Sequence, residues 1–172
     1  RQLIAFGFPV VRERAYAMLT EPGGKLVTAG FITESTDQFA LARLNSDGSA
    51  DRSFGDNGRV IFGFGGEEQA YALARTAGGS LVAVGSVTSP HLGKNFMIVK
   101  FSPTGVFECF NVTDFEGGDD QAHAVAIQAD GKIVAAGEAW GKSTLDLNMG
   151  VVRYNADCTV DSTFAGDGKT MV

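Results

Sequence analysis

Two pairs of neighbouring carboxylates in this 172-residue chain each follow a Gly-Gly dipeptide. They are Glu67 with Glu68 and Asp119 with Asp120. Paired carboxylates can act together as general acid and base, or they can bind Ca²⁺. Because neither pair has the spacing of a calcium-binding loop, we interpret them as ligand candidates on a solvated loop, with no metal expected and Ca²⁺ only a weak alternative.

Other candidates for ligand contact lie in three loops between strand-like segments, at residues 31–38, 86–95 and 138–148. Their side chains include His91, Lys94, Trp140 and Lys142. An exposed tryptophan can stack on a sugar ring or anchor a partner protein, and the alternative is that Trp140 packs over the end of its own strands. No nucleophile accompanies His91, and the G-x-S-x-G, HExxH and Walker motifs are absent.

The most regular charge pattern places a basic residue eight positions before an acidic one. It occurs three times, as Arg43 with Asp51, Lys100 with Glu108, and Arg153 with Asp161. Across a hairpin, these positions face each other directly or diagonally, which predicts cross-strand ion pairs. Because the pattern recurs three times, we expect it to be structural rather than catalytic.

One short stretch also occurs three times, and it indicates which elements position these residues. The copies are EPGGKLVTAG (21–30), TAGGSLVAVG (76–85) and QADGKIVAAG (128–137), so their final glycines recur after 55 and 52 residues. An alternating A-x-A segment precedes each copy and an apolar run follows it; a second turn, such as Asp47-Gly48, then leads to an outer strand. This pattern predicts four short antiparallel strands per copy, as in the blades of a β-propeller.

We therefore expect an all-β fold in one segment covering residues 1–172. Its three repeats lie at about 1–58, 59–110 and 111–172, and the chain begins and ends in the same phase of the repeat. Three blades are too few for a ring, since propellers usually have four to eight. We expect another chain, identical or a different fragment, to complete a ring of six to eight blades.

The repeated residues resemble the bacterial delta-60 repeat, a propeller-type repeat. Copy 3 carries D-G-K-I-V-x-A-G at 130–137, and copy 1 carries F-A-L-A-R at 39–43 followed by D-G-S-x-D-x-x-F-G at 47–55. Copy 2 lacks the F-G segment after Glu108, which predicts a different connection leaving that blade. In copy 3, Cys158 replaces the turn glycine. The resemblance implies a bacterial propeller protein and implies almost nothing about activity.

Composition limits the possible partners. The net charge of −6 argues against a nucleic-acid partner, and no apolar run is long enough for a membrane span. Cys109 and Cys158 lie 49 residues apart without CxxC spacing, which favours unpaired thiols, with one disulfide as the alternative. The chain begins at Arg1, as a processed product or a piece of a longer protein would.

The favoured function is a binding or scaffold module of a secreted, periplasmic or cell-surface bacterial protein. Its loops on one face would contact a carbohydrate or a protein. The alternative is a propeller-type hydrolase, esterase-like or glycosidase-like, with His91 and Glu68 or Asp120 at the central opening and possible assistance by a metal. His123 occupies the position of Tyr16 and Tyr71 in the repeat, which predicts a packing role for it.

Overall fold

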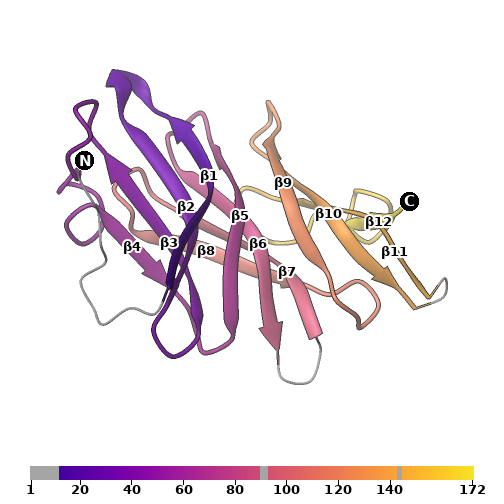
Figure 1. Cartoon of the computed structure of the whole chain (residues 1–172). Helices are drawn as coiled ribbons and strands as arrows, with labels where there is room; N and C mark the ends of the chain where they lie inside the picture. The colour runs from indigo at the N-terminus through magenta and orange to yellow at the C-terminus, as the bar shows by residue number, and fades with distance from the viewer. Residues whose placement is uncertain (1–11, 90–92, 143–144) are drawn as a thin grey trace.

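The computed structural model describes residues 12–89, 93–142 and 145–172. Within these residues it contains twelve strands, one short 3₁₀ turn (Pro22–Gly24) and no α-helix. The strands form three antiparallel four-stranded sheets, each from consecutive strands (Figure 1). The prediction of an all-β chain with three blades is therefore confirmed. The described part has no helix that could cross a bilayer.

Each blade takes its strands in chain order from the inner to the outer edge. Blade 1 contains β1 (Arg12–Thr20), β2 (Leu26–Thr33), β3 (Asp37–Leu44) and β4 (Arg59–Phe62). Blade 2 contains β5 (Glu67–Arg75), β6 (Leu81–Ser89), β7 (Gly93–Phe101) and β8 (Phe107–Thr113). Blade 3 contains β9 (Gln121–Ile127), β10 (Ile133–Gly141), β11 (Asp146–Tyr154) and β12 (Lys169–Met171). Blades 1 and 2 thus extend a few residues past the repeat boundaries drawn at 58 and 110.

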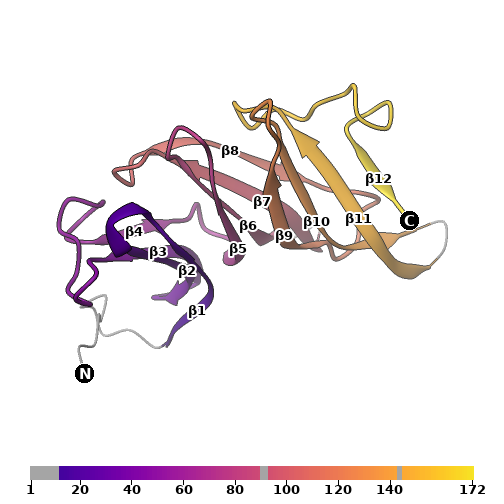
Figure 2. The same cartoon turned by 90° about the horizontal axis from the view of Figure 1, so that it is seen from above.

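The blades fan out about their inner strands. β1, β5 and β9 lie side by side, whereas β4, β8 and β12 diverge (Figure 2). This is the radial arrangement of a propeller. The arc formed by the described residues does not close into a ring (Figure 2).

A β-bulge recurs at the same place in every inner strand. In blade 1, Ala15 pairs with Gly30 and Ala17 pairs with Ala29, so Tyr16 is the extra residue. The bulge pushes the backbone against the facing glycine, and a Cβ at Gly30 would lie 1.8 Å from the carbonyl oxygen of Arg14. The same clash would occur at Gly85 (1.8 Å) and Gly137 (1.9 Å). The final glycine of each repeated stretch is therefore required by close backbone approach.

Hydrophobic cores fill the two joints between blades. Every blade has a rear face, toward the preceding blade, and a forward face, toward the next one. In blade 2 the rear face carries Leu81, Ala83, Met97 and Val99, and the forward face carries Val82, Val84, Phe96 and Ile98. Alternation along β6 and β7 thus gives blade 2 two apolar faces, and every one of these eight side chains is buried.

The outer strands depart from the simple repeat. In blades 1 and 3 a turn-rich segment (51–58 and 161–168) precedes the outer strand, which has only four or three residues. Blade 2 lacks this segment, and its seven-residue strand β8 follows the turn at 102–105 directly. The different connection predicted after Glu108 therefore produces a longer outer strand.

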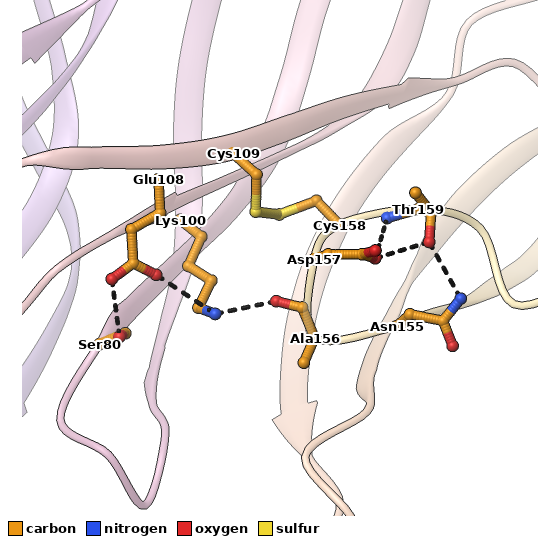
Figure 3. The surroundings of a disulfide bond; sticks show 9 residues. All are labelled: Ser80, Lys100, Glu108, Cys109, Asn155, Ala156, Asp157, Cys158 and Thr159. Atoms are coloured by element: carbon orange, nitrogen blue, oxygen red, sulfur yellow. Dashed lines mark hydrogen bonds and ion pairs between the residues drawn. A yellow bond between two sulfur atoms is a disulfide. The ribbon is translucent and has the colours of Figure 1, made fainter.

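A disulfide joins blade 2 to blade 3. Cys109 in β8 is bonded to Cys158 in the turn between β11 and β12, with their Cα atoms 6.0 Å apart (Figure 3). The favoured interpretation of two unpaired thiols was wrong. The spacing of 49 residues could not show that β8 passes beside the turn of the next blade.

Candidate functional site

Strand pairing places the loops between second and third strands, and the connections between blades, at one end of the blades. Arg12 at the start of β1 pairs with Thr33 at the end of β2, and Thr33 pairs with Asp37 at the start of β3. Blade 2 has the same arrangement. We call this end the loop rim; its described loops are 34–36, 63–66, 114–120 and the segment around 142. The opposite end, the turn rim, carries the tight turns at 21–25, 45–49, 76–80, 102–106, 128–132 and 155–159.

The extra residue of each inner-strand bulge carries an aromatic ring. The ring centroids of Tyr16 and Tyr71 are 5.2 Å apart, and those of Tyr71 and His123 are 5.1 Å apart. Tyr16 and His123 are exposed, while Tyr71 is half-buried. These three rings form one row across three blades, which we call the aromatic row. His123 is therefore not enclosed in a core, in contrast to the packing role expected for it.

Hydrogen bonds connect the aromatic row to the joint between blades 1 and 2. The Tyr71 hydroxyl donates to Gln69 Oε1 over 2.9 Å, and Gln69 Nε2 donates to Asp37 Oδ2. Asp37 also accepts from Thr33 Oγ1 over 2.6 Å. The row thus borders a fixed set of donors and acceptors, which can recognise the hydroxyl groups of a ligand.

Two arginines border the exposed end of the row. Arg14 lies with its Cζ 5.8 Å from the centre of the Tyr16 ring, and its Nη1 reaches the Tyr16 hydroxyl over 3.4 Å. Arg12 lies 3.9 Å from Asp37. Further along the rim the charges change sign, because Glu67 and Asp119 occupy the position of Arg12 in blades 2 and 3. The rim is thus polar and mixed in charge, which does not favour a polyanionic ligand.

The candidate pair Glu67 and Glu68 divides into an exposed and a buried residue. Glu67 is exposed on the loop rim. Glu68 is buried, and its Oε1 accepts the backbone N–H groups of Phe64 (3.2 Å) and Gly66 (3.0 Å). Its Oε2 is buried without a hydrogen-bond partner. Glu68 therefore holds the connection between blades 1 and 2.

Asp119 and Asp120 divide in the same way. Asp120 is buried and accepts the backbone N–H groups of Phe115 (2.9 Å) and Trp140 (2.8 Å). Burial raises the pKa of Asp120, and these two hydrogen bonds act against that rise. Exposed Asp119 accepts the backbone N–H of Lys94 over 2.9 Å. The described residues contain no group of three His, Cys, Asp or Glu side chains that could hold a metal ion.

The remaining loop candidates gather only in part. Trp140 is half-buried against the backbone of Gly118, where a Cβ would lie 2.3 Å from its side chain. Lys94, Asp119 and Trp140 thus lie together at the joint of blades 2 and 3. Lys142 is exposed on the loop that follows. His91 lies outside the described residues.

The charge pairs spaced by eight all lie on the turn rim, away from the aromatic row. Arg43 Nε lies 2.7 Å from Asp51 Oδ2, Lys100 Nζ lies 3.2 Å from Glu108 Oε2, and Arg153 Nε lies 2.7 Å from Asp161 Oδ2. A second cation reaches each aspartate over 2.7 Å, from Lys25 to Asp51 and from Lys132 to Asp161. These lysine hydrogen bonds are the main cause that lowers the pKa of both carboxyl groups, and the arginines contribute as well.

Sequence reasoning aligned Tyr16, Tyr71 and His123 but did not consider them as a site. The available signal was the glycine inside the second strand of every copy, because an interior strand glycine often marks a bulge. A bulge turns one residue of the inner strand out of the regular alternation, and a simple strand pattern assigns that residue to packing.

Three radially arranged four-stranded sheets with an aromatic row along their inner strands define a β-propeller repeat protein. Two segments, residues 21–54 and 128–164, match the model of the family described as domain of unknown function (DUF5122) beta-propeller. The match over these two segments supports a β-propeller repeat family. The matched segments lie in blades 1 and 3, which both carry the turn-rich segment that blade 2 lacks. No curated protein matches the chain.

Proposed function

We propose that this chain is a binding module that presents its loop rim and aromatic row to a carbohydrate, within a propeller completed by blades of a partner chain. The observation that carries the proposal is the aromatic row itself. Three equivalent residues on three adjacent inner strands leave their rings in contact with each other and at least partly open to solvent.

A carbohydrate suits this surface better than other ligand classes. Aromatic rings can stack on the apolar faces of sugar rings, while the neighbouring hydroxyl, amide and carboxylate groups of Tyr71, Gln69 and Asp37 can bind sugar hydroxyls. The net charge of −6 disfavours polyanions. A protein ligand is the other outcome that the binding experiment below can reveal.

The disulfide supports a location outside the bacterial cytoplasm. Disulfides form and persist in oxidising environments such as the periplasm, the cell surface and the extracellular medium. The bond between Cys109 and Cys158 therefore favours a secreted, periplasmic or cell-surface protein.

The hydrolase alternative gains no support from the described geometry. Glu68 and Asp120, its candidate carboxylates, both hold backbone N–H groups of the connections between blades. No nucleophile lies beside them among the hydrogen-bonded contacts of the described residues.

Binding to a panel of immobilised glycans tests the proposal, with affinities measured by calorimetry. We expect His123→Ala and Tyr16→Ala to weaken binding about tenfold, which corresponds to about 1.4 kcal/mol. Both side chains are exposed, so the fold should be unaffected. Phe110→Ala, which removes an exposed ring from outer strand β8, is the matched control. Absence of glycan binding, or equal binding by all variants, would overturn the proposal. Binding of a protein instead of a glycan would show that the ligand of this surface is a protein.

A further inference from the structure

The forward face of blade 3 has no neighbour among the described residues. Phe39, Phe96 and Met149 occupy the same position in the third strands of the three blades. Phe39 and Phe96 are fully buried against the next blade, whereas Met149 is 66% exposed. The turn-rich segment shows the same contrast, since Phe54 is buried and Phe164 is half-buried. With respect to the described residues, blade 3 therefore presents an unpaired apolar face of the kind that forms both internal joints.

The rear face of blade 1 shows the complementary feature. Leu73 and Val125 pack against the preceding blade, whereas Met18, at the equivalent position in β1, is 64% exposed. Small, buried residues line this part of the blade: Ala40 and Ala42 replace Met97 and Val99 of blade 2. A cavity of about 240 Å³ lies at this place, lined by Thr28, Ala40, Ala42 and Leu44 among others. The rear face of blade 1 can therefore accept a protruding side chain such as methionine.

Both internal joints also use one directed polar contact. Arg43 Nη1 of blade 1 donates to the carbonyl oxygen of Pro103 over 2.5 Å. Lys100 Nζ of blade 2 donates to that of Ala156 over 2.8 Å (Figure 3). Pro103 and Ala156 are the second residues of equivalent turns between the third and fourth strands. The cation of each ion pair thus reaches the turn of the next blade.

Blade 3 has the donor of such a contact, and blade 1 has the acceptor, each without a partner among the described residues. Arg153 binds Asp161 through Nε and Thr163 through Nη2, but its Nη1 has no acceptor in the described part of the chain. At the other end, the carbonyl oxygen of Ser46, equivalent to those of Pro103 and Ala156, accepts no hydrogen bond from a described residue. A donor at one end therefore matches an acceptor at the other.

We propose that a second copy of this chain docks head to tail on the first. The forward face of blade 3, with Met149 and Arg153, meets the rear face and the 45–48 turn of blade 1 in the other copy. This inference rests on the ring completion proposed above and names the partner. Two copies supply six blades, within the usual range of four to eight, whereas three copies would exceed it. Two identical joints then close the ring.

Sedimentation equilibrium of the intact chain and of face variants tests the docking. The wild type should have the mass of two chains. Met149→Asp and Met18→Asp, on opposite faces, should each shift it toward the mass of one chain, because each places a charge in the apolar joint. Val106→Asp is the control, since Val106 is 63% exposed and lies on neither end face. A wild-type monomer at all concentrations, or a dimer that both face variants leave intact, would overturn the proposal.

Variants of Arg153 test the polar contact separately. Arg153→Ala should weaken dimerisation about tenfold, while Arg153→Lys should retain most of it because Lys100 makes the equivalent contact. Lys132→Ala is the matched control, because Lys132 also binds Asp161. If Lys132→Ala weakens dimerisation as much as Arg153→Ala does, the proposed hydrogen bond from Arg153 across the joint is refuted.

Glycan binding by the same variants separates the two proposals. A monomeric wild type that still binds glycans would refute the second copy and leave the proposed function in place. A dimer that binds no glycan would refute the function and leave the docking in place.

Discussion

At the residue scale, the glycines of the repeated stretch show how one atom decides a local structure. The sequence indicated that these glycines recur in strands, but it could not show which contact excludes a side chain. The structure identifies the contact as a carbonyl oxygen of the bulged inner strand, 1.8 Å from a Cβ placed at Gly85. The aromatic row was missed for the same reason, because register is not visible in a pattern of apolar residues.

Substitution of Gly85 by alanine tests this account of the bulge. The methyl group would collide with the Gln69 carbonyl oxygen, and we expect a loss of about 3 kcal/mol in the free energy of unfolding. Gly78→Ala is the control, because the nearest atom to a Cβ there is Thr76 Oγ1 at 3.9 Å. The measurement is the urea denaturation midpoint of both variants. Equal effects at the two positions would contradict the account.

The ion pairs predict a defined dependence of stability on pH. The hydrogen bond from Lys25 is the main cause that lowers the pKa of Asp51 in the folded state. Ionised Asp51 therefore stabilises the fold fully above the pKa of an aspartate in the unfolded chain, about 4. The contribution is lost as the pH falls through the folded-state pKa. We expect Asp51→Asn to cost about 2 kcal/mol at pH 7 and progressively less below pH 4. A difference from the wild type that stays constant down to pH 2 would refute this assignment.

At the element scale, the disulfide takes the place of a missing segment. In the first joint, Gly105 of the blade 2 turn packs against Gly55 and Phe54, and a Cβ there would lie 2.9 Å from the Gly55 nitrogen. Blade 2 has no counterpart of that segment, so the equivalent turn of blade 3 has room for the side chain of Cys158. The sequence revealed both departures, the shortened connection and the cysteine, but not that they compensate each other.

Loss of this bond should cost about 4 kcal/mol, as expected for a closed loop of this length. Cys158 has a φ of +67°, so Cys158→Gly should be about 1 kcal/mol more stable than Cys158→Ala, since glycine adopts this conformation without strain. Denaturation with and without reductant provides the measurement. Reduction should lower the free energy of unfolding of the wild type to about that of Cys158→Ala. It should leave the free energy of unfolding of both variants unchanged. A wild type insensitive to reductant would contradict a stabilising role.

At the scale of the whole molecule, the sequence predicted the blades and their number because each copy repeats the same strand and turn signals. It could not predict which faces remain open, since that depends on the alternation of side chains after each bulge. The structure shows an arc with one exposed methionine on each end face, Met18 and Met149, while Met97 lies fully inside a joint. The proposed second copy would cover both methionines and make this arc half of a closed propeller.

Hydroxyl-radical oxidation of the native wild-type chain, read by mass spectrometry at each methionine, tests this claim most directly. In a closed ring, Met18 and Met149 should oxidise as slowly as Met97 at high protein concentration, and both should become reactive together on dilution. If Met18 and Met149 oxidise at every concentration as fast as they do in the unfolded chain while Met97 stays protected, the end faces are open and the propeller is not completed by a second copy.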